Sequence, residues 1–397
     1  MEISRPMPCQ TARKAVQRQA PRTIRGPGRL ASILLLAGLV GPQVLSAQIR
    51  VSDLVVTTGF AAEGYSGNLA SVTVPVVDST DRAHSTIGQI GVRGELQLFE
   101  GTSTSLWAGF DVGIRQFVAG GFSFRDYSPR EKAGRANISL IQGLGRWGNF
   151  SVSGMARARS VNDRPPMPLY LQAGFDQVAG SFRYQTPILE GVRFDLQLDA
   201  ERADFEAAET GLTLNLLDRR SRGMELGAEW GESWTIRFFG GARRTEYPQQ
   251  GSFDPSDPFR RDRMVNVGGT WSYASSFLAE IGVVGTVNRS NSLRPEYDAV
   301  SLTADFLMPL PFWGLGMRAY GVLTGKSYVQ DTEFARLVPG EEADNASIVY
   351  LDLTRQLADN LDTTLRLGWT RAETDIGDSY YERYGATLLF NYRPFLR

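Results

Sequence analysis

The amino-acid sequence predicts an all-β protein that forms a single closed antiparallel transmembrane β-barrel of about sixteen strands, with fourteen to eighteen as the range. Three observations lead to this fold class. Segments of about ten to fifteen residues alternate apolar with polar or small side chains at a period of two. Short and long polar connections alternate between these segments. After the first 47 residues, no apolar run is long enough for a transmembrane helix.

Residues 1–47 differ from the rest of the 397-residue chain. A stretch rich in arginine precedes an apolar run at 30–41, which is followed by Leu45-Ser46-Ala47. This order is typical of a signal peptide, so we expect 1–47 to be cleaved on export and 48–397 to form the barrel. An N-terminal membrane anchor is the alternative. The only cysteine, Cys9, falls in this segment, so the expected mature chain has no disulfide.

Segment 191–201 shows the alternation most clearly. One face carries Val192, Phe194, Leu196, Leu198 and Ala200, and the other carries Arg193, Asp195, Gln197, Asp199 and Glu201. The same pattern recurs at 89–98, 105–115, 234–241, 277–287, 361–369 and 384–392. Each of these segments therefore predicts a strand with two chemically different faces.

Seven short connections alternate with eight long ones, which together join sixteen strands. The short ones are 100–103, 145–149, 187–190, 231–233, 274–276, 309–312 and 358–360. The long ones lie near 65–85, 119–134, 161–168, 204–222, 245–261, 288–297, 327–346 and 371–380. Alternation is weak at 53–64 and 168–186, which sets the range on the strand count.

This layout is that of an antiparallel meander, which as an open sheet would leave two unpaired edges. Closure into a barrel pairs both edges, and in lipid an unpaired backbone group is too costly to tolerate. The short connections are then periplasmic turns and the long ones extracellular loops. The soluble alternatives are a β-sandwich and a β-propeller, but the sequence lacks the blade repeat of a propeller.

The closing segment at 384–395, YGATLLFNYRPF, resembles the C-terminal signal that bacterial outer-membrane β-barrel proteins present to their assembly machinery. By strand count the chain resembles the porins. This resemblance implies placement in the bacterial outer membrane, with outer-membrane lipids and the barrel-assembly machinery as partners. The expected third loop, 161–168, is shorter than the constricting loop of general trimeric porins, so the oligomeric state stays open.

Parity along the strands predicts which side chains face the lumen and which face lipid. The lumen-lining candidates are Arg93, Glu95, Asp111, Arg115, Arg157, Arg159, Arg193, Asp195, Asp199, Glu201, Glu225, Glu229, Arg237, Arg243, Glu280, Asp305, Arg318, Lys326, Asp352 and Arg366. Candidates for the aromatic girdles at the membrane interfaces are Trp230, Trp234, Tyr273, Phe277, Trp313 and Trp369.

Several chemistries are disfavoured. The balance of 42 basic and 43 acidic residues gives no field for nucleic acid, and one cysteine with one histidine excludes Cys- or His-rich metal sites. A GxGxxG string at 143–148 bridges two expected strands, which is the wrong context for a dinucleotide. The acidic lumen candidates could bind a divalent cation, but a polar wall is the favoured interpretation. We therefore expect no metal and no cofactor.

His84 is the only possible imidazole base, and it falls in an expected loop with no visible serine and acid partners. A non-enzyme is therefore expected. The favoured function is passive diffusion of small hydrophilic solutes or ions through a charged lumen. The alternatives are a non-conducting barrel that acts as an anchor, adhesin or assembly partner, and an outer-membrane lipid hydrolase. The apolar patch of loop 204–222 is expected either to fold into the lumen or to extend its flanking strands.

Overall fold

The computed structural model describes residues 50–67, 83–120, 127–163, 174–206, 217–253, 256–292, 296–329, 347–373 and 380–394. These residues form sixteen strands: β1 (Arg50–Gly67), β2 (Ala83–Glu100), β3 (Thr104–Gly120), β4 (Arg130–Gly143), β5 (Asn149–Asn162), β6 (Phe175–Gln185), β7 (Val192–Phe205), β8 (Arg219–Gly231), β9 (Trp234–Tyr247), β10 (Arg260–Ala274), β11 (Leu278–Ser290), β12 (Tyr297–Pro309), β13 (Leu315–Tyr328), β14 (Ser347–Ala358), β15 (Leu361–Glu373) and β16 (Tyr380–Tyr392). A single turn of 3-10 helix, η3, covers Gly145–Trp147. None of the helices in these ranges is long and apolar enough to cross a membrane.

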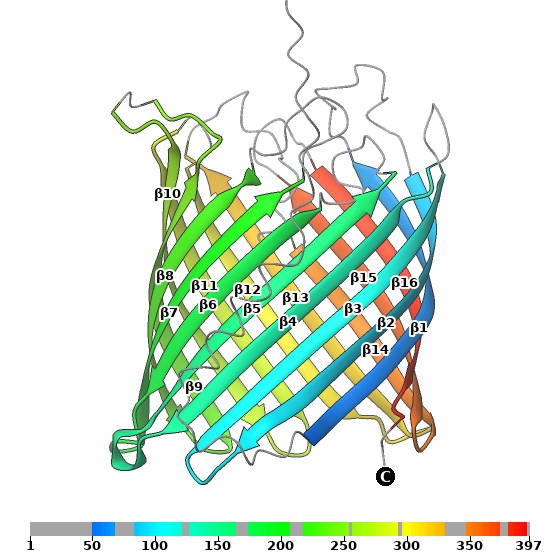
Figure 1. The fold of residues 1–397 in the computed structure, drawn as a ribbon, viewed down its shortest axis with the longest axis horizontal. Coiled ribbons are helices and arrows are strands. Elements are labelled where there is room, and N and C mark those ends of the chain that lie inside the picture. Colours follow the sequence, from blue (N-terminus) through cyan, green and yellow to red (C-terminus); the bar gives the residue numbers. More distant parts are fainter. Residues whose placement is uncertain are drawn as a thin grey trace, which may run out of the picture. The chain divides into compact units, whose positions relative to one another are not determined.

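The sixteen strands close into one barrel in which each strand pairs antiparallel with its neighbour in sequence. Closure is made by β1 and β16, which pair from Val56 opposite Tyr392 to Gly67 opposite Tyr381. Figure 1 shows the tilted strands wrapping around a single axis. The predicted fold class and the count of sixteen strands are confirmed.

Seven short connections join the strands where the sequence predicted them, and they lie at one end of the barrel, where β16 also ends (Figure 1). The β6–β7 connection contains a two-residue turn at Glu190 and Gly191. Glu190 and Gly191 have positive φ angles of 51° and 85°, and two backbone hydrogen bonds of 2.8 and 2.9 Å join Leu189 to Val192. Such two-residue turns match the twist of antiparallel strands, and glycine adopts positive φ without strain.

At the opposite end the strands run further than the alternation predicted. β4 begins at Arg130 and β8 at Arg219, inside the segments expected to be loops. His84, also expected in a loop, lies in β2, so that prediction was wrong. Backbone pairing continues beyond the point where the outward side chains cease to be apolar, and periodicity alone cannot detect this continuation.

Three parts of the sequence interpretation fall outside the described residues: the expected signal peptide, Phe395, and the loop leucines Leu212, Leu214 and Leu216. Leu217, the last leucine of that patch, is described and is buried. The cleavage of 1–47 and the fate of the loop patch stay predictions.

The register sorts the side chains onto two faces with opposite polarity. Large apolar residues on the outward face remain exposed, among them Phe238 at 55%, Val267 at 65%, Val283 at 50%, Val300 at 59% and Leu323 at 47%. Directly paired residues share a face, and the charged residues of the strands occupy mainly the other one. An apolar exterior around a polar interior is the arrangement expected of a barrel surrounded by lipid.

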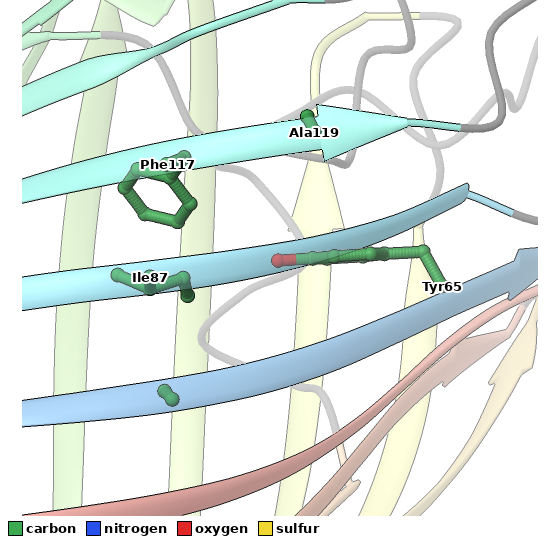
Figure 2. Close-up of a cluster of buried hydrophobic side chains, with 5 residues drawn as sticks. Tyr65, Ile87, Phe117 and Ala119 are labelled. Atoms are coloured by element: carbon green, nitrogen blue, oxygen red, sulfur yellow. The ribbon is translucent and has the colours of Figure 1, made fainter.

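An apolar cluster interrupts the polar inner face near the end of β1, β2 and β3 that carries the long connections. It consists of Ala61, Tyr65, Ile87, Phe117 and Ala119, and Figure 2 shows these side chains on the three neighbouring strands. The guanidinium of Arg115 lies 5.0 Å from the centre of the Phe117 ring. The cluster therefore packs apolar side chains directly beside the charged groups of this part of the wall, and Phe117 contacts one of them, Arg115.

The two faces predict that the same substitution has different costs at neighbouring positions of β11. Val283 faces outward near the middle of the strand, whereas Val284 faces the interior cavity. Val283→Arg should lower the free energy of unfolding by about 2–4 kcal/mol in phospholipid vesicles, because lipid does not solvate a guanidinium. Val284→Arg should cost clearly less. Urea unfolding followed by tryptophan fluorescence measures both, and equal costs would contradict the assignment of the faces.

Candidate pore lumen

All twenty predicted lumen-lining residues share the inner face of the wall. Cross-strand pairs connect them in rows, such as Arg93 opposite Asp111, and Arg318 opposite Asp352, which in turn lies opposite Arg366. The parity stays in phase around the whole barrel because each pair of neighbouring strands keeps its register over the paired length, with bulges confined to strand ends.

The inner face encloses a cavity of about 630 Å³. Its lining comes from nine consecutive strands, β5 to β13, and includes charges of both signs, among them Arg157, Arg243, Lys326, Asp199 and Glu225. Only the concave side of a closed wall brings nine strands together around one space. Six of the twenty predicted charged residues therefore border this interior cavity.

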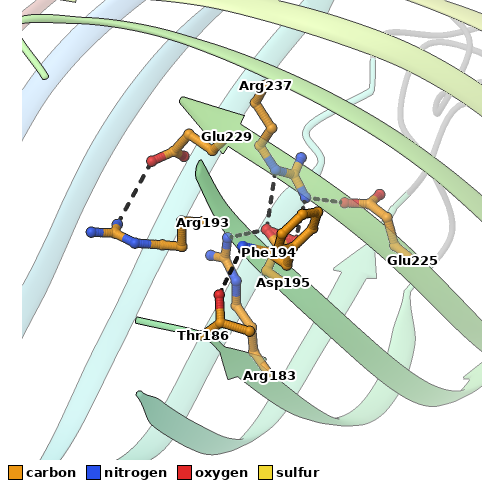
Figure 3. Close-up of polar contacts among 8 residues, drawn as sticks. All are labelled: Arg183, Thr186, Arg193, Phe194, Asp195, Glu225, Glu229 and Arg237. Atoms are coloured by element: carbon orange, nitrogen blue, oxygen red, sulfur yellow. Dashed lines mark hydrogen bonds and ion pairs between the residues drawn. The ribbon is translucent and has the colours of Figure 1, made fainter. Parts of the chain in front are cut away.

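Figure 3 shows an ion-pair network that crosses four strands, β6 to β9. Asp195 on β7 accepts hydrogen bonds from Arg183 at 3.0 Å and from Arg237 at 3.0 and 3.2 Å. Arg237 also donates to Glu225 at 2.7 Å. A separate pair, Arg193 and Glu229, lies 3.6 Å apart in the same region. Asp195 therefore binds two guanidinium groups through short, charge-assisted hydrogen bonds.

Two glycines of β8 allow these contacts to pass from β7 to β9. A Cβ at Gly227 would lie 2.6 Å from Oδ2 of Asp195 and 2.7 Å from Nη2 of Arg237. A Cβ at Gly223 would lie 2.5 Å from Oδ1 of Asp199, whose carboxylate is bound to Arg243 at 3.0 Å. The absence of a side chain on the intervening strand is therefore what lets residues two strands apart form ion pairs.

A second cluster lies on β12 to β15. Arg318 binds Asp305 through two hydrogen bonds of 2.6 and 3.0 Å, and Arg366 binds Asp352 through two of 2.7 Å. The rings of Tyr320 and Tyr350 stack beside these pairs with their centres 4.9 Å apart. Arg366 lies 4.6 Å from the centre of the Tyr350 ring. Bidentate pairing and stacking together hold both guanidinium groups against the wall.

A third group of charges lies near the ends of the strands that carry the long connections. Arg115 pairs with Glu63 at 3.4 Å and with Glu131 at 3.5 Å, and Arg159 pairs with Glu131 at 3.1 Å. Arg219 pairs with Glu201 at 3.1 Å. Most of the wall charge in this region is therefore neutralised by a neighbour along the wall.

Among the described residues, three predicted charges on β2 and β3 have no ion-pair partner, and two further ones, Arg157 and Lys326, lie over aromatic rings. Arg93, Glu95 and Asp111 form no ion pair with any residue of the ranges given above. Arg157 stacks over the ring of Phe175 at 5.0 Å. Lys326 lies over Tyr297 and Tyr328 at 4.2 and 4.5 Å. The uncompensated charge is concentrated on β2 to β5, and ion pairs dominate the charged clusters elsewhere.

Two carboxyl groups flank the β7–β8 connection outside the strands. The main-chain N–H of Phe205 donates to Oδ1 of Asp218 at 2.7 Å, and the main-chain N–H of Glu206 donates to the carbonyl oxygen of Gly174 at 2.8 Å. Burial raises the pKa of both Asp218 and Glu206. As the pH falls, these groups should take up protons before an ordinary carboxyl does.

Sequence parity missed several members of these clusters. Glu63 and Arg183 lie in the two segments of weak alternation, where no strand phase had been assigned. Glu131 and Arg219 lie in strands that extend into predicted loops. Once the true strand bounds are known, the same parity rule places all four on the inner face.

The girdle candidates fall at both ends of the outer face. Trp230 packs against Phe238 at 5.2 Å, and Tyr273 packs against Phe277 at 5.0 Å beside the short turns. Trp234 lies opposite Tyr273, and Trp313 is 76% exposed in the β12–β13 turn. Trp369 lies toward the other end, opposite Tyr384. This placement is the one that aromatic belts require.

The remaining motifs lie apart from the charged clusters of the inner face. His84 lies on the outward face, where its Nε2 would be 2.9 Å from a Cβ at Gly120, and it makes no hydrogen bond to any described residue. The GxGxxG string forms the end of β4 and the η3 turn that leads into β5. Within the described ranges, no three His, Cys, Asp or Glu side chains are placed to hold a metal ion.

The role of Gly227 gives a direct test of the β6–β9 network. Gly227→Ala should lower the free energy of unfolding by about 1–3 kcal/mol, because the new methyl group must displace Asp195 or Arg237. Gly368→Ala is the matched control, since a Cβ at that strand position meets no atom within 4 Å. Urea midpoints in one detergent compare the two variants. A loss no larger at Gly227 than at Gly368 would argue against the bridging role.

Comparison with known proteins shows a likeness in architecture alone. No protein-family model matches the chain, and no curated protein matches it in sequence. Among solved structures, it is similar to OccK7 (OpdD) of Pseudomonas aeruginosa, with 12% identity and a TM-score of 0.40 over 87% of this chain and 99% of that one. A deltaS2 mutant of TodX, a monoaromatic hydrocarbon channel, also gives 12% and 0.40, over 87% and 91%. OmpF of Salmonella typhi in complex with daunomycin gives 11% and 0.40, over 86% and 98%.

Proposed function

We propose that the protein is a porin-like channel of a bacterial outer membrane, through which small hydrophilic solutes or ions diffuse passively. The observation that carries this proposal is the inner wall, where charged side chains from consecutive strands border a polar cavity inside a closed sixteen-stranded barrel. Barrels of this strand number leave an aqueous channel, whereas eight strands are filled by their own side chains. Transport would follow the concentration gradient and need no chemical step.

The distribution of charge supports weak selectivity between ions. Ion pairs run along the wall between strands one or two positions apart, so their fields largely cancel within a few ångströms. The exception is the row formed by Arg93, Asp111, Arg135 and Arg157 on β2 to β5, where each residue lies opposite the next. With three guanidinium groups and one carboxylate, this row favours anions locally.

The location of the protein in the outer membrane is part of the same proposal. The apolar outer band supports a lipid environment, and the short turns would face the periplasm. Export would use residues 1–47 as a signal peptide, and insertion would use the assembly machinery that reads the closing strand, β16. A barrel that conducts nothing and serves as an anchor or adhesin is the competing function. A conductance measurement in a planar bilayer separates the two.

Cysteine labelling tests the water-filled lumen residue by residue, because the only native cysteine, Cys9, lies outside 50–394. Gln197 lines the cavity, and its neighbour Leu198 faces outward and is 42% exposed. In a planar bilayer, a charged methanethiosulfonate reagent should lower the single-channel conductance of the Gln197→Cys variant. The Leu198→Cys variant should not respond. Absence of conducting steps in the unmodified protein would refute the channel itself.

The row of Arg93, Asp111, Arg135 and Arg157 predicts how substitutions change the ion selectivity of the channel. Replacing Arg93 and Arg135 together by Gln should move the reversal potential in a KCl gradient toward that of a cation-selective pore, because two unpaired positive charges leave the lumen. The control variant combines Arg318→Gln with Asp305→Asn, which removes one ion pair and no net charge. Equal reversal potentials for the row variant and the wild type would show that the row does not lie in the conduction path.

A further inference from the structure

The outer face carries a feature that passive diffusion does not use. Four arginines, Arg222, Arg244, Arg263 and Arg289, lie in one straight row across β8, β9, β10 and β11. Each lies directly opposite the next in the register, and all four have the parity that faces away from the lumen. We call these four residues the outward arginine row.

Only two of the four arginines in the row pair with an acidic side chain among the described residues. Arg244 pairs with Glu246 at 3.0 Å and Arg289 with Asp298 at 2.8 Å, in both cases through exposed side chains. Arg222 and Arg263 are exposed and make no ion pair with any described residue. Like charges directly opposite one another on a sheet destabilise it. A row of this kind is therefore stabilised when an external anion lies across it.

The position of the row selects the kind of anion. The next outward row toward the short turns is apolar, with Met224 opposite Ala242 and Val265 opposite Val287. Arg222 lies nine residues before Gly231, where β8 ends, and Arg263 lies eleven before Ala274, where β10 ends. About 9–11 residues of strand cross a bilayer. The row therefore lies at the boundary of the apolar band, on the side of the long connections.

We propose that the outward arginine row binds the phosphate groups of a lipid headgroup in the outer leaflet, with the acyl chains lying on the apolar row beneath it. Guanidinium groups bind phosphate through two parallel hydrogen bonds. Neighbouring strands are about 4.8 Å apart, so the row spans roughly 15 Å and can contact two phosphates of one headgroup. A second copy of this chain would bring the same positive charge and is not favoured there. The inference needs the barrel in a membrane but does not depend on conduction.

The test uses the full folded barrel in a neutral detergent, with bis-phosphorylated lipid A as the probe and native mass spectrometry as the measure of binding. The Arg222→Gln, Arg263→Gln double variant should bind this lipid roughly thirtyfold more weakly than the wild type, since each basic group at an anionic surface contributes about five- to sixfold. The Lys132→Gln, Arg355→Gln variant is the matched control, because it also removes two outward positive charges, on β4 and β14. Its affinity should stay within about threefold of the wild type.

Three further measurements keep the result specific. Arg222→Lys with Arg263→Lys should restore most of the binding, which separates charge from any damage to folding. Lipid A without phosphates should bind as weakly as the Gln variant does. Inorganic phosphate at the same phosphate concentration should fail to displace the lipid. Equal binding by the wild type and the Gln variant, retention of the phosphate-free lipid, or displacement by inorganic phosphate would each overturn the assignment. A channel that proved not to conduct would leave it standing.

Discussion

The structure depends on the requirement that every backbone N–H and C=O in the wall find a partner. Pairing of β1 with β16 meets this requirement at the last open edge. Once the wall is closed, each strand has one face toward the interior and one toward the outside, and the alternation of the sequence assigns side chains to them. The polar cavity, the apolar outer band and the rows of charge all follow from this closure.

Closed pairing also explains how the charges on the inner face are held. A barrel wall has no second layer of structure behind it, so a charged side chain must find its counter-ion on its own or a nearby strand. Glycines 223 and 227 widen the reach of such contacts by leaving space above β8. The result is a wall whose charges neutralise one another locally, as Asp195 shows with two arginines. The charges on β2 to β5 that lack such partners are then the ones whose field is least cancelled at the inner face.

Much of this could be predicted from the sequence, because alternation at a period of two is strong wherever one face meets lipid and the other water. The sixteen strands, the seven short turns and the inward face of all twenty charged candidates follow from that signal. The signal fails where the environment is the same on both sides. Strand ends beyond the apolar band, such as the start of β8 at Arg219, carry polar residues on both faces, and a period-two signal cannot distinguish them from loops. Contacts such as Arg183 with Asp195 also require the register between strands, which parity does not contain.

The even number of strands has a topological consequence. β1 begins and β16 ends at the same rim, and the two strands are direct neighbours in the wall. The order in which the chain visits the strands is therefore cyclic, and no strand is structurally first or last. A linker that joined β16 to β1 would resemble the other short connections, and the chain could then be opened within any of the long ones with the same set of strand neighbours. The architecture is thus defined by adjacency around the ring rather than by the position of its ends.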